Sequence, residues 1–139
     1  MKKYYELKQE NQERVDAFPF MFAFSNQQFE EGKQKLGVKD NSELLSIGSG
    51  GYIRKTDREA YKTMMGEIET AKGEYLKDPE QLKDALIYEL ENHEYIYTMD
   101  LTDTMEALGL DEEELTGEQL GIISQARRQY LAESEELNS

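Results

Sequence analysis

The side chains with the clearest chemical potential are carboxylates in the last third of the chain: Asp100, Asp103, Asp111, Glu112, Glu113, Glu114 and Glu118. Three interpretations stay open. They can be solvated helix starts, because acids at a helix N-terminus offset the helix dipole. They can form an acidic patch that binds a protein, or two clustered groups can hold Mg²⁺ or Ca²⁺ weakly. The spacing lacks the pattern of an EF-hand calcium loop, so we predict no metal site.

Catalytic residues are harder to find. His93 is the only histidine, and it lies among Asn92, Glu94 and Tyr95, where it is a candidate general base beside a carboxylate. No serine stands in a recognisable nucleophile motif, and the chain has no cysteine. We favour a histidine at a helix end, near the last carbonyls. We therefore expect no enzymatic activity and no cofactor.

A glycine cluster at residues 48–51 invites comparison with a phosphate-binding loop. Such a loop needs Gly-Lys-Ser/Thr followed by a helix, so that amides converge on the phosphate. Here the glycines lead into Tyr52, Ile53 and Arg54, which are typical of a strand. The pattern predicts a flexible hairpin turn.

Four phenylalanines alternate strictly at positions 18, 20, 22 and 24. A period of two places all four rings on one face of a strand. A stacking platform for nucleic-acid bases needs a basic groove, which the neighbouring sequence lacks. The pattern therefore indicates that this face packs in the core.

These residues have to be positioned by short elements. Helical spacing and capping residues predict helices over residues 2–17, 25–37 and 56–73, and a further helix that begins at Asp78-Pro79. A short helix is predicted from Thr102 or Asp103 to Gly109, and a last helix begins at Asp111 or Thr116. Strands are predicted at residues 18–24, 44–47 and 52–54, and residues 95–99 form a fourth strand or an extended link. The fold class is α+β, a small antiparallel sheet of three or four short strands with several packed helices.

Length and composition describe the protein that carries these elements. Its 139 residues fit a single domain, 1–139, whose tail at 133–139 is expected to fray. The absence of cysteine suits a reducing compartment, and no apolar run has the length of a membrane span. We expect a cytoplasmic protein.

The net charge of the chain predicts the kind of partner that it binds. The formal net charge is −14, and residues 99–139 alone carry eleven acids against Arg127 and Arg128. A surface this negative repels nucleic acid and anionic membranes and attracts basic protein surfaces. The expected partner is therefore a basic protein, with no direct contact to nucleic acid or membrane.

Three stretches carry a family resemblance: FAFSNQQFEEG at residues 22–32, SIGSGGYIRK at 46–55 and YELENHEY at 88–95. Together they resemble a family of short acidic proteins from phages, plasmids and other bacterial mobile elements, over roughly residues 4–110. Size, charge and the lack of a catalytic motif are similar to those of anti-CRISPR proteins. This resemblance implies a setting in the bacterial host cytoplasm and assigns no functional residue.

The resulting hypothesis is an acidic binding protein that inhibits a nucleic-acid-handling enzyme, with a Cas9-type effector nuclease as the leading partner. Such effectors hold nucleic acid in basic channels, for which closely spaced carboxylates can compete. The seven carboxylates named first are the expected contact surface. The alternative is a mobile-element accessory or regulatory adaptor that binds another basic protein.

Overall fold

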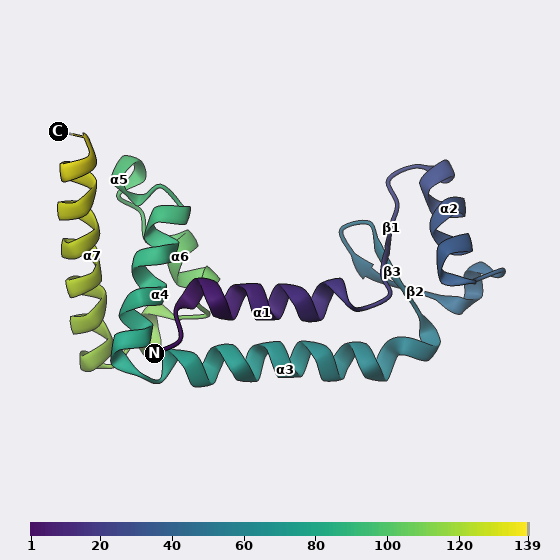
Figure 1. Ribbon diagram of the computed structural model, residues 1–139, viewed down its shortest axis with the longest axis horizontal. Helices are drawn as coiled ribbons and strands as arrows, with labels where there is room; N and C mark the ends of the chain where they lie inside the picture. Colours follow the sequence, from purple (N-terminus) through teal and green to yellow (C-terminus); the bar gives the residue numbers. More distant parts are fainter. Residues whose placement is uncertain (139) are drawn as a thin grey trace. The chain divides into compact units, whose positions relative to one another are not determined.

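The computed structural model describes the backbone of residues 1–138 and the side chains of residues 1–136. Over this part of the chain the elements are α1 (Tyr4–Asp16), β1 (Met21–Phe22), α2 (Asn26–Leu36), η1 (Asn41–Glu43), β2 (Leu44–Gly48), β3 (Gly51–Arg54), η2 (Lys55–Asp57), α3 (Arg58–Leu76), α4 (Pro79–Asn92), α5 (Tyr95–Thr98), α6 (Thr102–Ala107), η3 (Glu112–Glu114) and α7 (Gly117–Asn138). Seven helices and a three-stranded antiparallel sheet confirm the α+β class (Figure 1). None of the helices described combines the length and the apolar character needed to cross a membrane.

The chain divides into two compact units. Unit 1 consists of Met1–Gln9 and Ala71–Ser139, and unit 2 consists of Glu10–Thr70. Helices α1 and α3 each contribute residues to both units. Charge is distributed unequally: unit 1 has nineteen acidic and eight basic residues, whereas unit 2 has eleven and eight. The single domain expected from length stays a prediction.

In unit 2 the sheet has the order β1-β3-β2, with both pairs antiparallel. The predicted hairpin of β2 and β3 is confirmed, and the glycine cluster forms its turn. Gly48 and Gly50 have φ angles of 90° and 78°, and Ser49 between them has 53°. Glycine adopts these left-handed values at little steric cost, which explains why the turn needs it.

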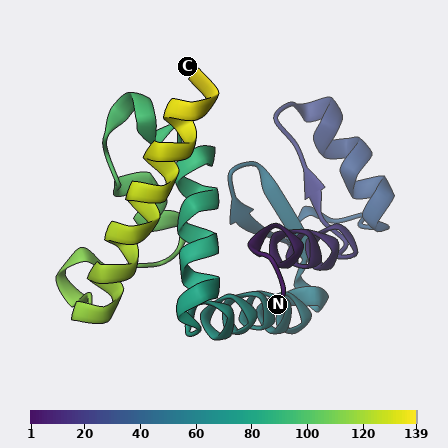
Figure 2. The same ribbon diagram turned by 60° about the vertical axis from the view of Figure 1, so that its left-hand side comes forward.

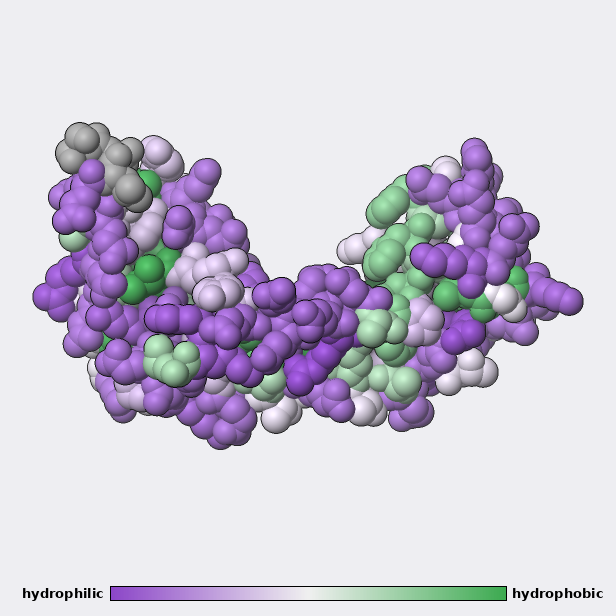
Figure 3. Space-filling model, in the orientation of Figure 1, coloured by the Kyte–Doolittle hydropathy of each residue, from purple (hydrophilic) through white to green (hydrophobic). Residues whose placement is uncertain are grey.

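Of the strand predicted at residues 18–24, only Met21–Phe22 forms a strand, and the four phenylalanines are not core residues as predicted, since Phe18 and Phe20 are only half-buried. Met21, on the opposite face of β1, is buried, whereas Phe22 and Phe24 are 57% and 78% exposed. Figure 3 shows hydrophobic surface in green over β1 and the hairpin. The reason is that α2 packs on the Met21 face, where Gly32 comes so close that an added Cβ would lie 2.8 Å from the Met21 Cε.

The core of unit 1 is built around α4. Its inner residues pack against α7, which lies beside it in both ribbon views (Figures 1 and 2), and against α5 and α6. Fully or nearly fully buried members of this core include Leu86, Leu90, Tyr95 and Ala126. The short helices of the last third of the chain are therefore attached to a well-packed scaffold.

Several predicted helix ends are confirmed. The Ser25 side chain accepts a hydrogen bond from the Gln28 N–H, and α2 ends at Gly37 in the left-handed region. Asp78 caps α4, with Pro79 at its first position. Of the two candidates for the start of the last helix, Thr116 precedes α7 and exchanges capping hydrogen bonds with Gln119.

One predicted helix has shifted ends, and one predicted strand or link is wrong. Helix α3 begins at Arg58 after a 3₁₀ turn and continues past Gly73 to Leu76, because Tyr75, near its end, is buried in the core. Tyr95–Thr98 form the helical turn α5, so residues 95–99 are neither the strand nor the extended link that was predicted. Glu94 and Met99, both left-handed, flank this turn, and core contacts of Tyr95 override its strand propensity.

At the C-terminal end, α7 is helical through Asn138. The segment expected to fray, 133–139, is therefore helix over residues 133–138, and Ser139 lies outside the described residues. Fraying itself stays a prediction.

Candidate functional site

The acidic segment, defined as residues 100–118, begins at the turn before α6. The Asp100 carboxylate accepts hydrogen bonds from the Thr102 hydroxyl at 2.7 Å and from the Thr102 N–H at 2.9 Å. These two hydrogen bonds lower the pKa of Asp100, so it is charged at neutral pH. Asp103 follows in the first turn of α6, where a negative charge is favourable.

The next acids belong to the 3₁₀ turn η3. Asp111 caps it, because its carboxylate accepts a hydrogen bond from the Glu113 N–H at 2.9 Å. Glu112–Glu114 make up the turn itself, and Glu118 lies in the first turn of α7. The interpretation as helix-start acids is therefore correct for the local structure, and it does not exclude a binding role.

All seven predicted site residues are exposed. Among the described residues none of them forms an ion pair, and no lysine or arginine occurs between Lys83 and Arg127 in the sequence. Lys72 does reach α6, but its Nζ donates a hydrogen bond to the Ala107 carbonyl, not to a carboxylate. The negative charge of the segment is therefore left unneutralised.

The backbone that carries these charges is held in place by apolar residues between them. Met105 and Leu108 are buried in the core of unit 1, and Leu101, Leu110 and Leu115 pack against that core. Apolar anchors thus alternate with exposed acids along the segment. The carboxylates extend from an ordered backbone, as a binding surface requires.

The structure brings some predicted residues together and separates others. Asp111, Glu112 and Glu113 line one shallow groove with Glu106, an exposed acid that the prediction left out. The i, i+3 spacing of Asp103 and Glu106 is a signal that could have found it. Glu118 lines a different groove, between the end of α3, the start of α4 and the start of α7.

A metal centre gets no support from these groups. Across the described residues, no cluster of three or more His, Asp or Glu side chains has an arrangement that could hold a metal ion.

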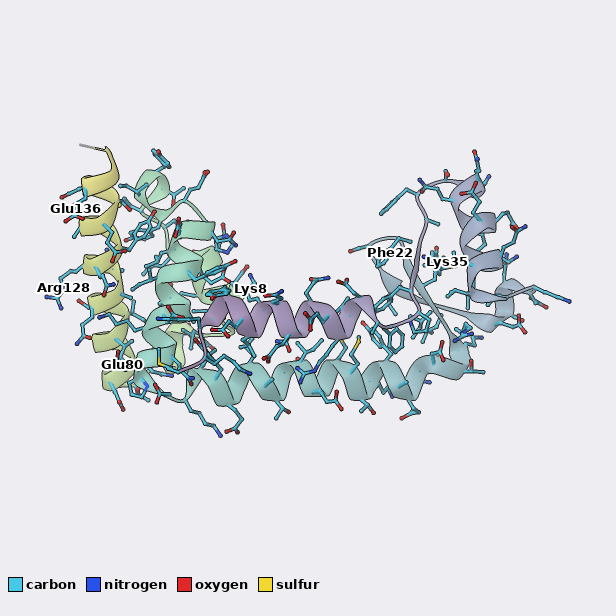
Figure 4. The ribbon with its side chains drawn as sticks, in the orientation of Figure 1. Lys8, Phe22, Lys35, Glu80, Arg128 and Glu136 are labelled. Atoms are coloured by element: carbon cyan, nitrogen blue, oxygen red, sulfur yellow. The ribbon has the colours of Figure 1, made fainter. Side chains whose placement is uncertain are left out.

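A second polar cluster, which sequence reasoning missed, surrounds Glu89 of α4. Its carboxylate is 1% exposed and accepts hydrogen bonds from the Tyr4 hydroxyl at 2.9 Å, Lys8 Nζ at 3.1 Å and Asn92 Nδ2 at 3.3 Å. Figure 4 shows Lys8 at the end of α1 that meets α4. Burial alone would raise the pKa of Glu89, but these hydrogen bonds outweigh it and lower the pKa. The cluster therefore contains a buried, charged glutamate.

His93 belongs to the edge of this cluster. It ends α4, as predicted, and its backbone N–H donates to the Glu89 carbonyl. The ring Nε2 lies 3.1 Å from the Glu89 carboxylate but not in hydrogen-bonding geometry. The carboxylate beside the His93 ring is therefore that of Glu89, four residues earlier in α4. Within the part of the chain that the structure describes, Nε2 has no hydrogen-bond partner.

The Tyr88 ring packs against two of the residues that donate to this carboxylate. The Tyr4 ring packs edge-on against Tyr88, with a centroid distance of 5.2 Å, and Lys8 Nζ lies 5.1 Å from the centroid of the Tyr88 ring. Burial, followed by the charge of Glu89, raises the pKa of Tyr4 well above its usual range. The Tyr4 hydroxyl thus keeps its proton at neutral pH and donates it to Glu89, and the cluster has the features of a structural link between α1 and α4.

Comparison with known proteins identifies the family to which the chain belongs. A search of curated proteins gave no match, and a search of solved structures gave none either. The sequence model of DUF7659, a family of unknown function, matches residues 3–130. This match covers most of the chain, which therefore belongs to the family DUF7659.

Proposed function

We propose that this protein binds a strongly basic protein surface through the acidic segment and thereby keeps nucleic acid from that surface. The leading candidate partner is a Cas9-type nuclease in the cytoplasm of a bacterial host, which would make the protein an anti-CRISPR inhibitor encoded by a mobile element. No catalytic step is part of this proposal.

The observation that carries the proposal is the exposed, unneutralised charge of the acidic segment on a packed backbone. Seven predicted acids and Glu106 lie within nineteen residues, all of them exposed. Duplex DNA presents about one charge per 1.7 Å of its axis, and nucleic-acid-handling enzymes match it with Lys and Arg. A compact run of carboxylates competes for the same cations.

The test is direct binding to a guide-loaded Cas9-type nuclease over a series of salt concentrations. We expect affinity to fall as salt rises, because exposed charges are screened. The double variant Glu112→Gln, Glu113→Gln should bind about 2- to 30-fold more weakly, since each exposed ion pair contributes about 0.2–1 kcal/mol.

A matched control removes the same charge elsewhere. Glu67 and Glu69 are exposed on α3, and their double change to Gln alters net charge equally without touching the acidic segment. If both double variants weaken binding to the same extent, net charge explains the effect and the acidic segment is not the interface. Binding that does not change with salt would refute the electrostatic mechanism.

The second candidate function is an adaptor or regulator that binds another basic protein. The same exposed carboxylates favour it, because they specify the charge of the partner and not its identity. Affinity capture from a host lysate, followed by purified binding with the recovered protein, separates the two candidates. Recovery of a basic protein other than a Cas effector would support the adaptor.

A further inference from the structure

Apolar side chains are exposed directly beside the acidic segment. Tyr97 of α5 is 77% exposed, and Met99, which follows α5, is 55% exposed. Asp100 comes next in the chain and Asp103 three residues later, both exposed. A large aromatic ring and a thioether therefore protrude where the run of carboxylates begins.

The backbone that presents these two side chains is fixed on one side by the core. Tyr95 is 1% exposed, its hydroxyl accepts a hydrogen bond from Arg127 Nε at 2.9 Å, and its ring meets Tyr130 edge-on. The Ile96 N–H donates to the Tyr130 hydroxyl at 3.1 Å. The turn is thus tied to α7 by two hydrogen bonds and one aromatic pair.

The geometry points to Tyr97 and Met99 as apolar anchors of the interface formed by the acidic segment. This inference rests on the proposed function and names the kind of partner surface: an apolar pocket with Lys and Arg around its rim. Tyrosine is enriched among the residues that dominate binding energy, and such residues bury in pockets surrounded by polar contacts. Asp100 and Asp103 would face the cations of the rim while Tyr97 fills the pocket.

The charge of the acidic segment favours a basic protein as the partner over nucleic acid, lipid or a second copy of the chain. Nucleic acid and anionic lipid are repelled by the neighbouring carboxylates. A second copy of the chain would bring another net charge of −14 to the same place. A basic protein surface is the occupant whose charge complements the exposed acids, and an apolar pocket within it matches the two protruding side chains.

The experiment measures binding to a guide-loaded Cas9-type nuclease with the double variant Tyr97→Ser, Met99→Asn. Asparagine suits position 99 because it tolerates the left-handed φ of 55° found there. The expected result is a 10- to 100-fold weaker affinity, since the loss of an anchoring side chain commonly has this effect. The dependence of affinity on salt should stay that of the wild type, because no charge changes.

Phe24→Ser is the matched control, because Phe24 is 78% exposed and lies in unit 2. Unchanged circular dichroism and melting temperature establish that each variant is folded. If the Tyr97→Ser, Met99→Asn variant binds as strongly as the wild type, this inference is wrong and the proposed function still stands. An equal loss in Phe24→Ser also overturns it, since the effect would not be specific to the turn. If the wild type binds no Cas9-type nuclease, the proposed function and this inference are both wrong.

Discussion

Replacing Glu89 tests whether the buried polar cluster holds α1 against α4. Glu89→Ala removes the acceptor of three side-chain hydrogen bonds, whereas Glu89→Gln keeps an acceptor of similar shape and removes only the charge. The two changes therefore separate the contribution of hydrogen bonding from the contribution of charge.

The magnitude follows from how exposed each partner is. The buried Tyr4 hydroxyl loses its acceptor in Glu89→Ala, which costs about 1–3 kcal/mol. Lys8 is 44% exposed, so its ion pair is screened and contributes about 0.2–1 kcal/mol. Loss of one buried methylene adds about 0.8 kcal/mol. We expect Glu89→Ala to lower the free energy of unfolding by about 2–5 kcal/mol, and Glu89→Gln by about 1 kcal/mol.

Urea denaturation followed by far-ultraviolet circular dichroism measures both values, with Glu91→Gln on the exposed face of α4 as the control. Because the folded-state pKa of Glu89 is lowered, its charge stabilises the protein above the unfolded-state pKa. That stabilisation disappears as pH falls through the folded-state pKa. The difference between wild type and Glu89→Gln should therefore shrink in acid. A cost below about 1 kcal/mol for Glu89→Ala, or a difference unaffected by pH, would refute the reasoning.

Three further predictions concern stability and are measured in the same way. Met21→Ala should lower the free energy of unfolding by about 2–4 kcal/mol, because Met21 fills the space under Gly32. Phe24→Ser should lower it by less than about 1 kcal/mol. The reverse order would mean that the phenylalanine face does lie in the core. Gly50→Ala should cost more than about 1 kcal/mol, since φ is +78° and the new Cβ would lie 2.6 Å from the Phe24 ring. A neutral result there would mean that neither the left-handed φ nor the Phe24 ring restricts this position. Thr104→Val should stabilise the protein by about 1 kcal/mol, because the buried Thr104 Oγ1 has no hydrogen-bond partner among the described residues. Destabilisation would indicate a bond that the hydroxyl does make.

Local signals in the sequence predicted the elements whose ends are set by local hydrogen bonds. Ser25, Gly37 and Asp78 act within four residues of themselves, and the structure places them as the sequence indicated. The α+β class followed from the same signals together with the glycine hairpin. The acids at 100–118 were likewise placed correctly at the starts of helical turns.

The predictions that failed depend on packing between elements, which no local pattern specifies. Alternation showed that the four phenylalanines share a face of the chain, but only the packing of α2 decides that Met21 points inward. The strand propensity of residues 95–99 yields to contacts with Tyr130, more than thirty residues later. No single-sequence pattern contains either piece of information.

Glu89 is the most instructive omission. Its partners Tyr4 and Lys8 lie 85 and 81 residues away in the sequence, so no local spacing joins them. One signal was available, because Glu89 falls within the apolar stripe formed by Leu82, Leu86 and Leu90 on α4. A carboxylate at such a position needs a buried partner.

The unequal charge of the two units has a consequence for how any encounter in solution begins. Unit 1 carries a formal charge of −11 and unit 2 only −3. A cationic macromolecule that comes within about one Debye length, some 8 Å at physiological salt, pulls much harder on the first than on the second. Early collisions with such a partner should therefore favour unit 1 over unit 2.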